Sequence, residues 1–516
     1  MKNNELNTTL PEEHYKETCN LLKAIDKNKI ATWLLEEGYF PEQNILPPSF
    51  KVDHFVLKNN PYIRNLKKPP RSNLGCVSYP KSFLTSRVYG IQHPHYYHDI
   101  VYWLIQDWAT IIDHIFNNDN SIYTYSMPIP INANCKGELS PLRSGRLIYE
   151  WIEMAERDLV AEAHRFNLLI RTDITNFYNS VYTHSIAWAL HGRDIAFADK
   201  NIKLIGNKID KLVQYANNGR TNGIPVGSAV SDLIAEILLA KIDQNVSLKL
   251  KNKNIAFLGT RFKDDYRILA NTEEDAKKIL RVLSEELHKF NLLISENKTK
   301  ILCLPEGLFR HHNREYFPYS LRKKNKIPFK SFEFTLLKVL DIHKAYPGTS
   351  IIEKFLSELF DKKYNLKLYF SNNLKVRKKQ ILKTFSLLFL LKRESEKILC
   401  YVMAIIEDIY RMDNGKYDLK KYLREIIKLE IKKASEKKSE FEIIWYIFFS
   451  RYLRIGLSFP SFKDDPVLKD NLLLKSMLAS SQKIFSDTDI TLFKAPNYCH
   501  DKKLAKQLSA FNRSKE

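Results

Sequence analysis

Three aspartates stand where short strands are expected to end or turn. Asp173 closes the expected strand 167–173, and Asp264 and Asp265 lie at the turn between two short strands expected within 255–269. Acidic turns are common, so each of these residues alone indicates little. If the strands lie side by side, the three carboxylates come together. Such a cluster repels itself unless divalent cations bridge it.

Carboxylates around Mg²⁺ or Mn²⁺ are suited to nucleotidyl transfer. One bound ion lowers the pKa of the attacking hydroxyl and a second neutralises the leaving pyrophosphate, with the two ions about 3.5–4 Å apart. The three aspartates therefore predict an enzyme that joins nucleotides with the help of metal ions.

The elements around these aspartates indicate an α+β layer. Apolar residues recur at helical spacing over 147–163, and the segment 224–228 precedes a second amphipathic helix. Thr272 with Asp275 resembles a capping box that opens a third helix. The order strand, helix, helix, acidic hairpin, helix, strand is typical of an α+β fold.

The last third of the chain has a different composition. Beyond about residue 335 it is rich in Lys, Leu, Ile, Glu and Phe, with few strand signals and little Gly or Pro. We therefore expect an all-helical domain at 331–516. Stacked helix pairs are one possible arrangement, although no clean sequence period supports a repeat.

Composition limits the class of protein. The 516 residues carry 81 Lys and Arg against 59 Asp and Glu, a net charge of +22, which favours polyanionic partners. A hydrophobic fraction of 44% excludes a disordered chain. Six cysteines without a C-x-x-C pair favour a reducing compartment. With neither a secretory signal nor a spanning segment in view, we expect a soluble, cytoplasmic protein with no membrane contact.

Four segments resemble, in order, motifs A to D of reverse transcriptases: 173–178 (DITNFY), 223–228 (GIPVGS), 262–265 (FKDD) and 295–299 (SENKT). The sequence 177–192 is similar to the bacterial abortive-infection reverse transcriptases of phage defence, which prophages often carry. The resemblance implies a right-hand polymerase. Its N-terminal extension and fingers would span 1–140, its fingers and palm 141–330, and a helical domain the remainder.

Roles carried over from these motifs concern the metal site first. Asp173 and Asp264 would be metal ligands, with Asp265 an accessory carboxylate. Lys298 in motif D would neutralise or protonate the departing pyrophosphate, although a lysine in a turn that faces water is the alternative.

Further roles concern the nucleotide. Tyr178 falls where reverse transcriptases place an aromatic gate against the 2′-hydroxyl, which implies deoxynucleotides; a plain core aromatic is the alternative. Val226 stands where many templated enzymes carry Gln, so a polar contact to the incoming nucleotide is missing. A guanidinium grips phosphate bidentately, so two arginines could clamp the triphosphate unless they are only surface charge. The residues expected around the nucleotide are Tyr178, Arg143, Arg146, Pro225, Val226 and Gly227.

The resemblance also implies protein-primed, template-independent DNA synthesis by a homo-oligomer, with single-stranded DNA attached covalently to the chain. A tyrosine phenol is the expected primer, and loop or N-terminal residues such as Tyr15, Tyr39 and Tyr62 are candidates. Two alternatives stay open: a template-copying reverse transcriptase bound to a structured RNA, and a non-catalytic nucleic-acid scaffold. Intact acids argue against the scaffold because clustered carboxylates destabilise a fold without metal.

Overall fold

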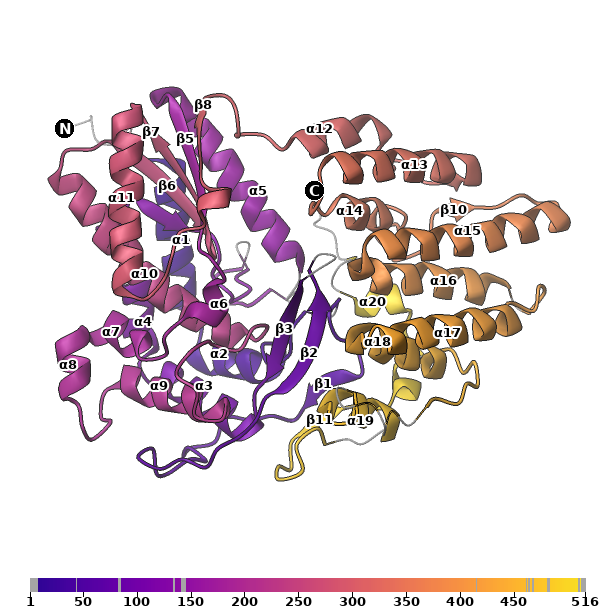
Figure 1. The fold of residues 1–516 in the computed structure, drawn as a ribbon, viewed down its shortest axis with the longest axis horizontal. Coiled ribbons are helices and arrows are strands. Elements are labelled where there is room, and N and C mark those ends of the chain that lie inside the picture. Colours follow the sequence, from indigo (N-terminus) through magenta and orange to yellow (C-terminus); the bar gives the residue numbers. More distant parts are fainter. Residues whose placement is uncertain are drawn as a thin grey trace.

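The computed structural model describes residues 8–511, apart from 43, 82–84, 133–134, 141–144, 414, 461, 463–464, 466–467, 480–482 and 509–510. In Figure 1 a sheet with its helices forms one side of the molecule and a stack of C-terminal helices forms the other. The hairpin of β2 (Gly75–Pro80) and β3 (Ser86–Ile91) stands between these two parts.

The central sheet has five strands in the order β4-β6-β7-β5-β8, and all its pairs are antiparallel except β4 with β6. Because β6 and β7 are joined by a turn of only two residues, their register is fixed by the turn itself. The predicted acidic hairpin is therefore confirmed. The strands are β4 (Ile122–Thr124), β5 (Leu168–Asp173), β6 (Phe257–Phe262), β7 (Asp265–Ala270) and β8 (Lys300–Cys303).

Helices cover both faces of this sheet. Helix α5 (Gly145–Glu162) packs on β6, and α11 (Glu273–Lys289) packs on β5 and β7 from the other face, beside α10 (Ala229–Asn252). Thr272 caps α11 by accepting a hydrogen bond from the Asp275 amide at 3.1 Å, as the capping box predicts. The three helices expected around the aspartates are thus present.

Further, shorter helices lie around the sheet. Helices α7 and α9 pack against one another, as do α2 and α3, and α4 lies on α10. The bounds of these helices are α1 (Leu10–Ala24), α2 (Lys27–Leu35), α3 (Pro94–Gln106), α4 (Trp108–Ile115), α7 (Ser185–His191), α8 (Arg193–Ala198) and α9 (Ile205–Ala216).

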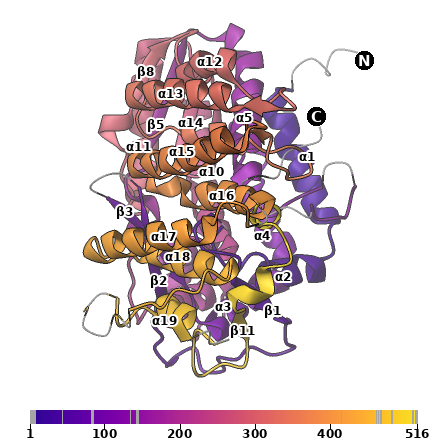
Figure 2. The same ribbon diagram turned by 90° about the vertical axis from the view of Figure 1, so that its right-hand side faces the viewer.

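The C-terminal region is mostly helical. Figure 2 shows its longer helices lying one below another. Its helices are α12 (His311–Tyr316), α13 (Phe329–Ala345), α14 (Ile351–Ser357), α15 (Leu374–Glu394), α16 (Leu399–Asp413), α17 (Leu419–Glu436), α18 (Glu440–Tyr452), α19 (Leu472–Ala479) and α20 (Leu504–Gln507).

The expectation of an all-helical C-terminal domain needs one correction, because the region also contributes short strands. β9 (Ile327–Pro328) pairs with β10 (Leu368–Tyr369), and β11 (Thr491–Phe493) pairs with β1 (Phe50–Asp53) from the N-terminal region. Strands of two or three residues carry no readable alternation. They form here because partners distant in the chain offer free backbone groups.

The C-terminal helices are joined to the rest of the molecule through buried side chains. The Trp445 indole on α18 is fully buried and donates a hydrogen bond to the Ile45 carbonyl at 3.1 Å. A Glu440 carboxylate accepts the Ser78 amide of β2 at 2.9 Å. One hydrophobic core therefore runs through both parts.

The state of the cysteines and the character of the helices were the basis for expectations about the compartment of this chain. All six cysteines have free thiols. Among the described residues, no helix combines the length and the apolar character needed to cross a bilayer.

A buried ion cluster in the helical stack predicts a large effect on stability. Lys392 of α15 lies 3.1 Å from Glu430 and 2.9 Å from Glu442, and all three side chains are at most 4% exposed. Lys392→Met leaves the Glu442 carboxylate buried without its ammonium partner. We expect the free energy of unfolding to fall by about 3–5 kcal/mol in urea denaturation.

The matched control lies on the same helix. Lys383 of α15 pairs with Glu333 at the surface, where its side chain is 55% exposed. Lys383→Met should cost less than about 1 kcal/mol. Equal, small losses in the two variants would show that the buried cluster contributes no more than a surface pair.

Candidate active site at the edge of the central sheet

The three predicted aspartates meet at one end of two neighbouring strands. Asp173 is the last residue of β5 and stands opposite Asp265, the first residue of β7, in the antiparallel register. Asp264 lies in the turn directly before Asp265, and the Asp264 carbonyl accepts a hydrogen bond from the Ile174 amide at 3.2 Å. Backbone pairing therefore makes the three aspartates neighbours at this edge of the sheet.

Crowding of these carboxylates changes their acidity. The pKa of Asp265 is raised to about 7 by burial and by the neighbouring charges of Asp264 and Asp173, and its acid form hydrogen-bonds Asp173. Burial, then the charge of Asp173, also raises the pKa of Asp264. The site thus holds more protons at neutral pH than three separate carboxyl groups would hold.

Lys298 joins this cluster from the 3₁₀ helix η2 (Glu296–Lys298). Its ammonium lies 2.7 Å from the Asp173 carboxylate, and its side chain remains 58% exposed. Partial burial opposes the charge of Lys298, but the bond to Asp173 outweighs it, and the net pKa of the ammonium is raised. The lysine is not a turn residue that only faces water.

The donor chemistry of the cluster fits a hard divalent cation, because carboxylate oxygens are the ligands that Mg²⁺ and Mn²⁺ accept. In the described part of the chain, however, no three His, Cys, Asp or Glu side chains converge closely enough to hold an ion. The Lys298 ammonium is the cation that contacts Asp173 here.

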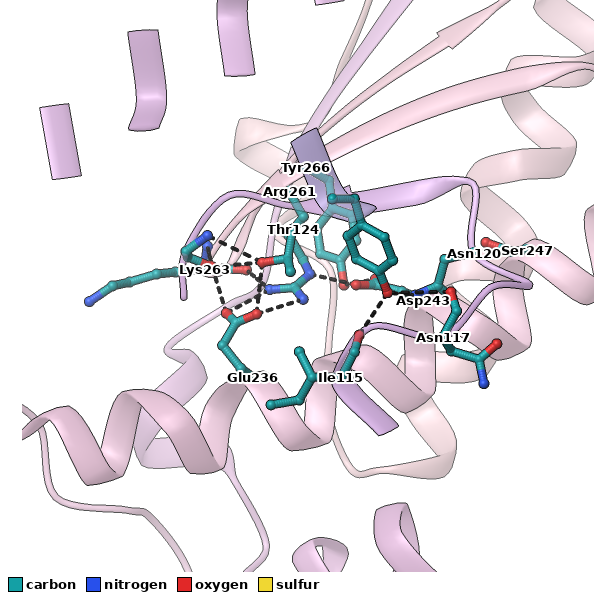
Figure 3. A network of polar contacts seen from close by, with 12 residues as sticks. Ile115, Asn117, Asn120, Thr124, Glu236, Asp243, Ser247, Arg261, Lys263 and Tyr266 are labelled. Atoms are coloured by element: carbon teal, nitrogen blue, oxygen red, sulfur yellow. Dashed lines mark hydrogen bonds and ion pairs between the residues drawn. The ribbon is translucent and has the colours of Figure 1, made fainter. Parts of the chain in front are cut away.

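A buried network anchors the acidic turn to α10 (Figure 3). The fully buried Arg261 guanidinium on β6 donates to both carboxylate oxygens of Glu236, at 3.0 and 3.1 Å, and to Asp243 at 2.7 Å. Tyr266 of β7 donates to the other oxygen of Asp243 at 3.0 Å. Both strands of the hairpin are thereby fastened to one helix.

The same network reaches the backbone beside Asp264. The Lys263 carbonyl accepts a bond from Arg261 at 3.1 Å, and the Lys263 amide donates to the Ser126 hydroxyl at 2.9 Å. That hydroxyl donates in turn to Glu236. Lys263 has a φ of 52°, in the left-handed region that non-glycine residues seldom adopt, so both of its backbone groups are held in a conformation that needs support.

Sequence reasoning missed this network. Its signal is the pair of acids Glu236 and Asp243 among the apolar residues of α10, together with an arginine inside a strand. Buried charges need partners, so these three residues had to meet.

Tyr178 lies beside the aspartates on the one-turn helix α6 (Phe177–Ser180). Its hydroxyl donates to Asp232 of α10 at 2.5 Å, and the other oxygen of that carboxylate is 3.1 Å from the Lys263 ammonium. Burial, then the charge of Asp232, raises the pKa of Tyr178 well above its usual value. The Tyr178 side chain is partly buried and packs against the hydrophobic core.

The segment 224–228 passes between Tyr178 and the β2–β3 hairpin. The Ile224 amide donates to the Tyr178 carbonyl at 2.9 Å, and the Val226 carbonyl accepts the Gly90 amide at 3.1 Å. Pro225 is buried, and Val226 is half-buried. Gly227 has a φ of +119°, and a Cβ there would stand 2.6 Å from the Tyr89 ring, so only glycine fits.

Arg87 of β3 is a further cation at the site that the sequence did not reveal. Its pKa is raised because its interactions with Tyr89, Asp264 and Tyr178 outweigh the effect of burial. Of the two arginines that were predicted, Arg143 lies outside the described residues. Arg146 lies in the first turn of α5, and its side chain is likewise outside the description.

Two of the three suggested priming tyrosines lie in the core. Tyr15 is 4% exposed and donates to the Ile115 carbonyl, and Tyr39 is 1% exposed and donates to the Gln92 carbonyl. Neither has the accessible position that priming requires. Tyr62 is half-buried and stacks on His95 with 4.0 Å between ring centroids.

The raised pKa of Asp265 predicts how stability depends on pH without metal. Its pKa is about 7 in the folded chain against about 3.8 when unfolded, so burial of the charged carboxylate, together with repulsion, lowers stability as pH rises between these values. Asp265→Asn removes that loss. We expect the melting temperature of the variant to exceed that of the parent above pH 7, with the difference shrinking towards pH 4, in chelator-treated samples.

A difference that stays constant from pH 4 to pH 8 would show that the like-charge repulsion assigned to Asp265 is absent. Asp194→Asn on α8, where the side chain is exposed, is the control and should change neither curve.

Comparison with known proteins places this site within a recognised domain. Three telomerase structures show distant likeness. Apo telomerase from Candida tropicalis is 12% identical, covering 80% of this chain and 69% of that one, with a TM-score of 0.34. A form lacking its C-terminal domain is 15% identical, covering 49% and 52%, with a TM-score of 0.31, so this chain spans about half of it.

Telomerase from Candida albicans with a fragment of telomeric RNA is 11% identical, covering 74% of this chain and 66% of that one, with a TM-score of 0.30. No curated protein matches the sequence. Residues 128–337 match the family model described as "Reverse transcriptase (RNA-dependent DNA polymerase)". That span includes the three aspartates and Lys298, so the site at the sheet edge lies in a reverse transcriptase domain.

Proposed function

We propose that this chain is a DNA polymerase that joins deoxynucleotides by two-metal nucleotidyl transfer. The observation that supports it most is the meeting of Asp173, Asp264 and Asp265 on adjacent strands inside a reverse transcriptase domain. In this proposal the central sheet with α10 and α11 is the palm, the β2–β3 hairpin belongs to the fingers, and 331–516 is the helical domain.

Asp173 and Asp264 would hold the Mg²⁺ or Mn²⁺ ions, with Asp265 as an accessory ligand. When bound, the ions lower the pKa of the attacking hydroxyl and neutralise the pyrophosphate. Lys298, whose raised pKa keeps it protonated, would exchange its bond to Asp173 for one to the departing pyrophosphate. The network of Arg261 and Glu236 would keep the Asp264 turn in place throughout.

The nucleotide would lie between the aspartates and the β2–β3 hairpin. Tyr178, tethered by Asp232, would pack against the sugar and leave no room for a 2′-hydroxyl. Arg87 of β3, whose charge interacts with Asp264 and Tyr178, would bind the triphosphate together with the predicted Arg143 and Arg146. Val226 would line this space, where its apolar side chain would offer no polar contact.

The resemblance to abortive-infection enzymes supports the finer parts of the proposal: a bacterial cytoplasmic phage-defence role, a homo-oligomer, and untemplated synthesis that starts on the protein. Since Tyr15 and Tyr39 are buried, the primer would be Tyr62 or another tyrosine. The description of the family model as an RNA-dependent polymerase favours the second candidate, a template-copying enzyme bound to RNA.

Incubation with one labelled deoxynucleotide and Mg²⁺, without template or primer, separates these candidates. We expect incorporation, and we expect the label to migrate with the denatured polypeptide until protease is added. Asp264→Asn should lower incorporation by about a hundredfold or more, because losing one ligand charge dismantles the metal site.

Asp194→Asn should leave incorporation at the parent level. Label that separates from the polypeptide on denaturation, or incorporation that needs an added primer and template, would make the template-copying candidate the better account. Parent-level incorporation by Asp264→Asn would contradict both candidates.

Sugar selection gives a second prediction. Tyr178→Ala should admit ribonucleotides and reduce the preference for deoxynucleotides by about tenfold or more, because exclusion is steric. Tyr178→Phe keeps the ring and loses only the bond to Asp232, so it should stay selective. Competition between labelled deoxy- and ribonucleotides measures the ratio. Unchanged selectivity in Tyr178→Ala would remove the gate from the proposal.

A further inference from the structure

We propose that α12, α13 and the segment between them form a surface that binds single-stranded nucleic acid. That this strand is the one made at the aspartate site rests on the proposed function. We call residues 309–338 the aromatic-basic surface.

Large aromatic rings on this surface face solvent. Phe317 in the 3₁₀ helix η3 (Phe317–Tyr319) and Phe334 on α13 are each 77% exposed, Phe309 is 55% exposed, and Tyr319 is 42% exposed. Four large rings are thus exposed within about thirty residues. Bases stack on such rings whatever their sequence, because every base has a π-face.

Cations are interleaved with these rings. Between Phe309 and Lys338 the chain carries eight Lys and Arg against two Glu. Both acids are engaged, Glu315 by the Tyr346 hydroxyl and Glu333 by Lys383. The exposed cations of the turn before α13 are Arg322, Lys323, Lys324 and Lys326. Alternating rings and cations suit a single strand, in which bases and phosphates alternate.

A row of cations connects this surface to the aspartates. Arg171 of β5 stands two residues before Asp173, so both side chains project from the same face of the sheet. Lys300 of β8 stands opposite Arg171 in the register, and both are exposed. From β8 the chain crosses to α12, which packs on α13 (Figure 1). A strand leaving Asp173 towards α12 would pass Arg171 and Lys300.

A second copy of this chain is the less favourable occupant. An interface between identical surfaces related by a two-fold axis would press the excess positive charge of 309–338 against itself. In the sequence, arginines stand between Phe309 and Phe317, and arginine and lysines between Tyr319 and Phe334. Charge complementarity therefore favours a polyanion.

The test measures binding of fluorescent single-stranded DNA and RNA oligonucleotides by anisotropy, in the Asp264→Asn background so that no strand is extended. Phe317→Ala with Phe334→Ala should weaken binding by about fivefold or more per ring. Lys323→Glu with Lys324→Glu should weaken binding and flatten its dependence on salt. The DNA and RNA arms identify which strand the surface prefers.

Matched controls lie elsewhere on the chain. Phe197 on α8 is 75% exposed with the Lys200 ammonium 4.0 Å from its ring centroid, and Lys420 and Lys421 are exposed on α17. Phe197→Ala, and Lys420→Glu with Lys421→Glu, should leave affinity unchanged. Losses no larger than those of the controls would overturn the proposal.

Sedimentation of the same variants measures whether the surface instead binds a second copy of this chain. A change in oligomeric state with unchanged oligonucleotide affinity would assign the surface to contacts between copies and overturn the proposal. Because the assay needs no catalysis, strand binding that depends on these rings would stand even if the parent protein incorporates no nucleotide.

Discussion

The acidic turn depends on one buried guanidinium. Arg261 is completely enclosed and holds two carboxylates of α10, and it also bonds the backbone carbonyl of Lys263. Breaking a buried pair by removing one partner typically costs about 3–5 kcal/mol, because the remaining charge stays unpaired. That requirement leaves the hairpin few alternative positions relative to α10. The left-handed backbone of Lys263, and with it the place of Asp264, follows from this constraint.

Repulsion among the three aspartates destabilises the turn that the Arg261 ion pairs stabilise. Burial, together with the charges of Asp264 and Asp173, raises the pKa of Asp265 to about 7, and the Lys298 ammonium offsets the charge on Asp173. The cluster is unfavourable without bound cations, and the Arg261 network holds it from behind, which is the arrangement that the proposed metal-binding role requires. The ion pairs of Arg261 with Glu236 and Asp243 stabilise the turn and so offset the repulsion among the three aspartates.

Local patterns in the sequence predicted the elements with a clear period. Helix α5, helix α11 with its Thr272 cap and the acidic hairpin are confirmed because their signals lie within one element. Contacts between distant segments left no local signal. Arg87 interacts with the charge of Asp264 from the β2–β3 hairpin, far from it in the sequence, and β11 pairs with a strand more than 400 residues earlier. Tyr15 and Tyr39 looked like terminal and loop residues, yet tertiary packing buries both.

The central claim is that Asp173 and Asp264 hold divalent cations beside a nucleotide. Anomalous diffraction from crystals soaked with Mn²⁺ and a deoxynucleoside triphosphate tests it most directly. The account predicts two manganese peaks about 3.5–4 Å apart, both within ligand distance of these carboxylates, with the Lys298 ammonium displaced from Asp173. Manganese bound elsewhere, with Lys298 still on Asp173 in a nucleotide-loaded crystal, would contradict the account.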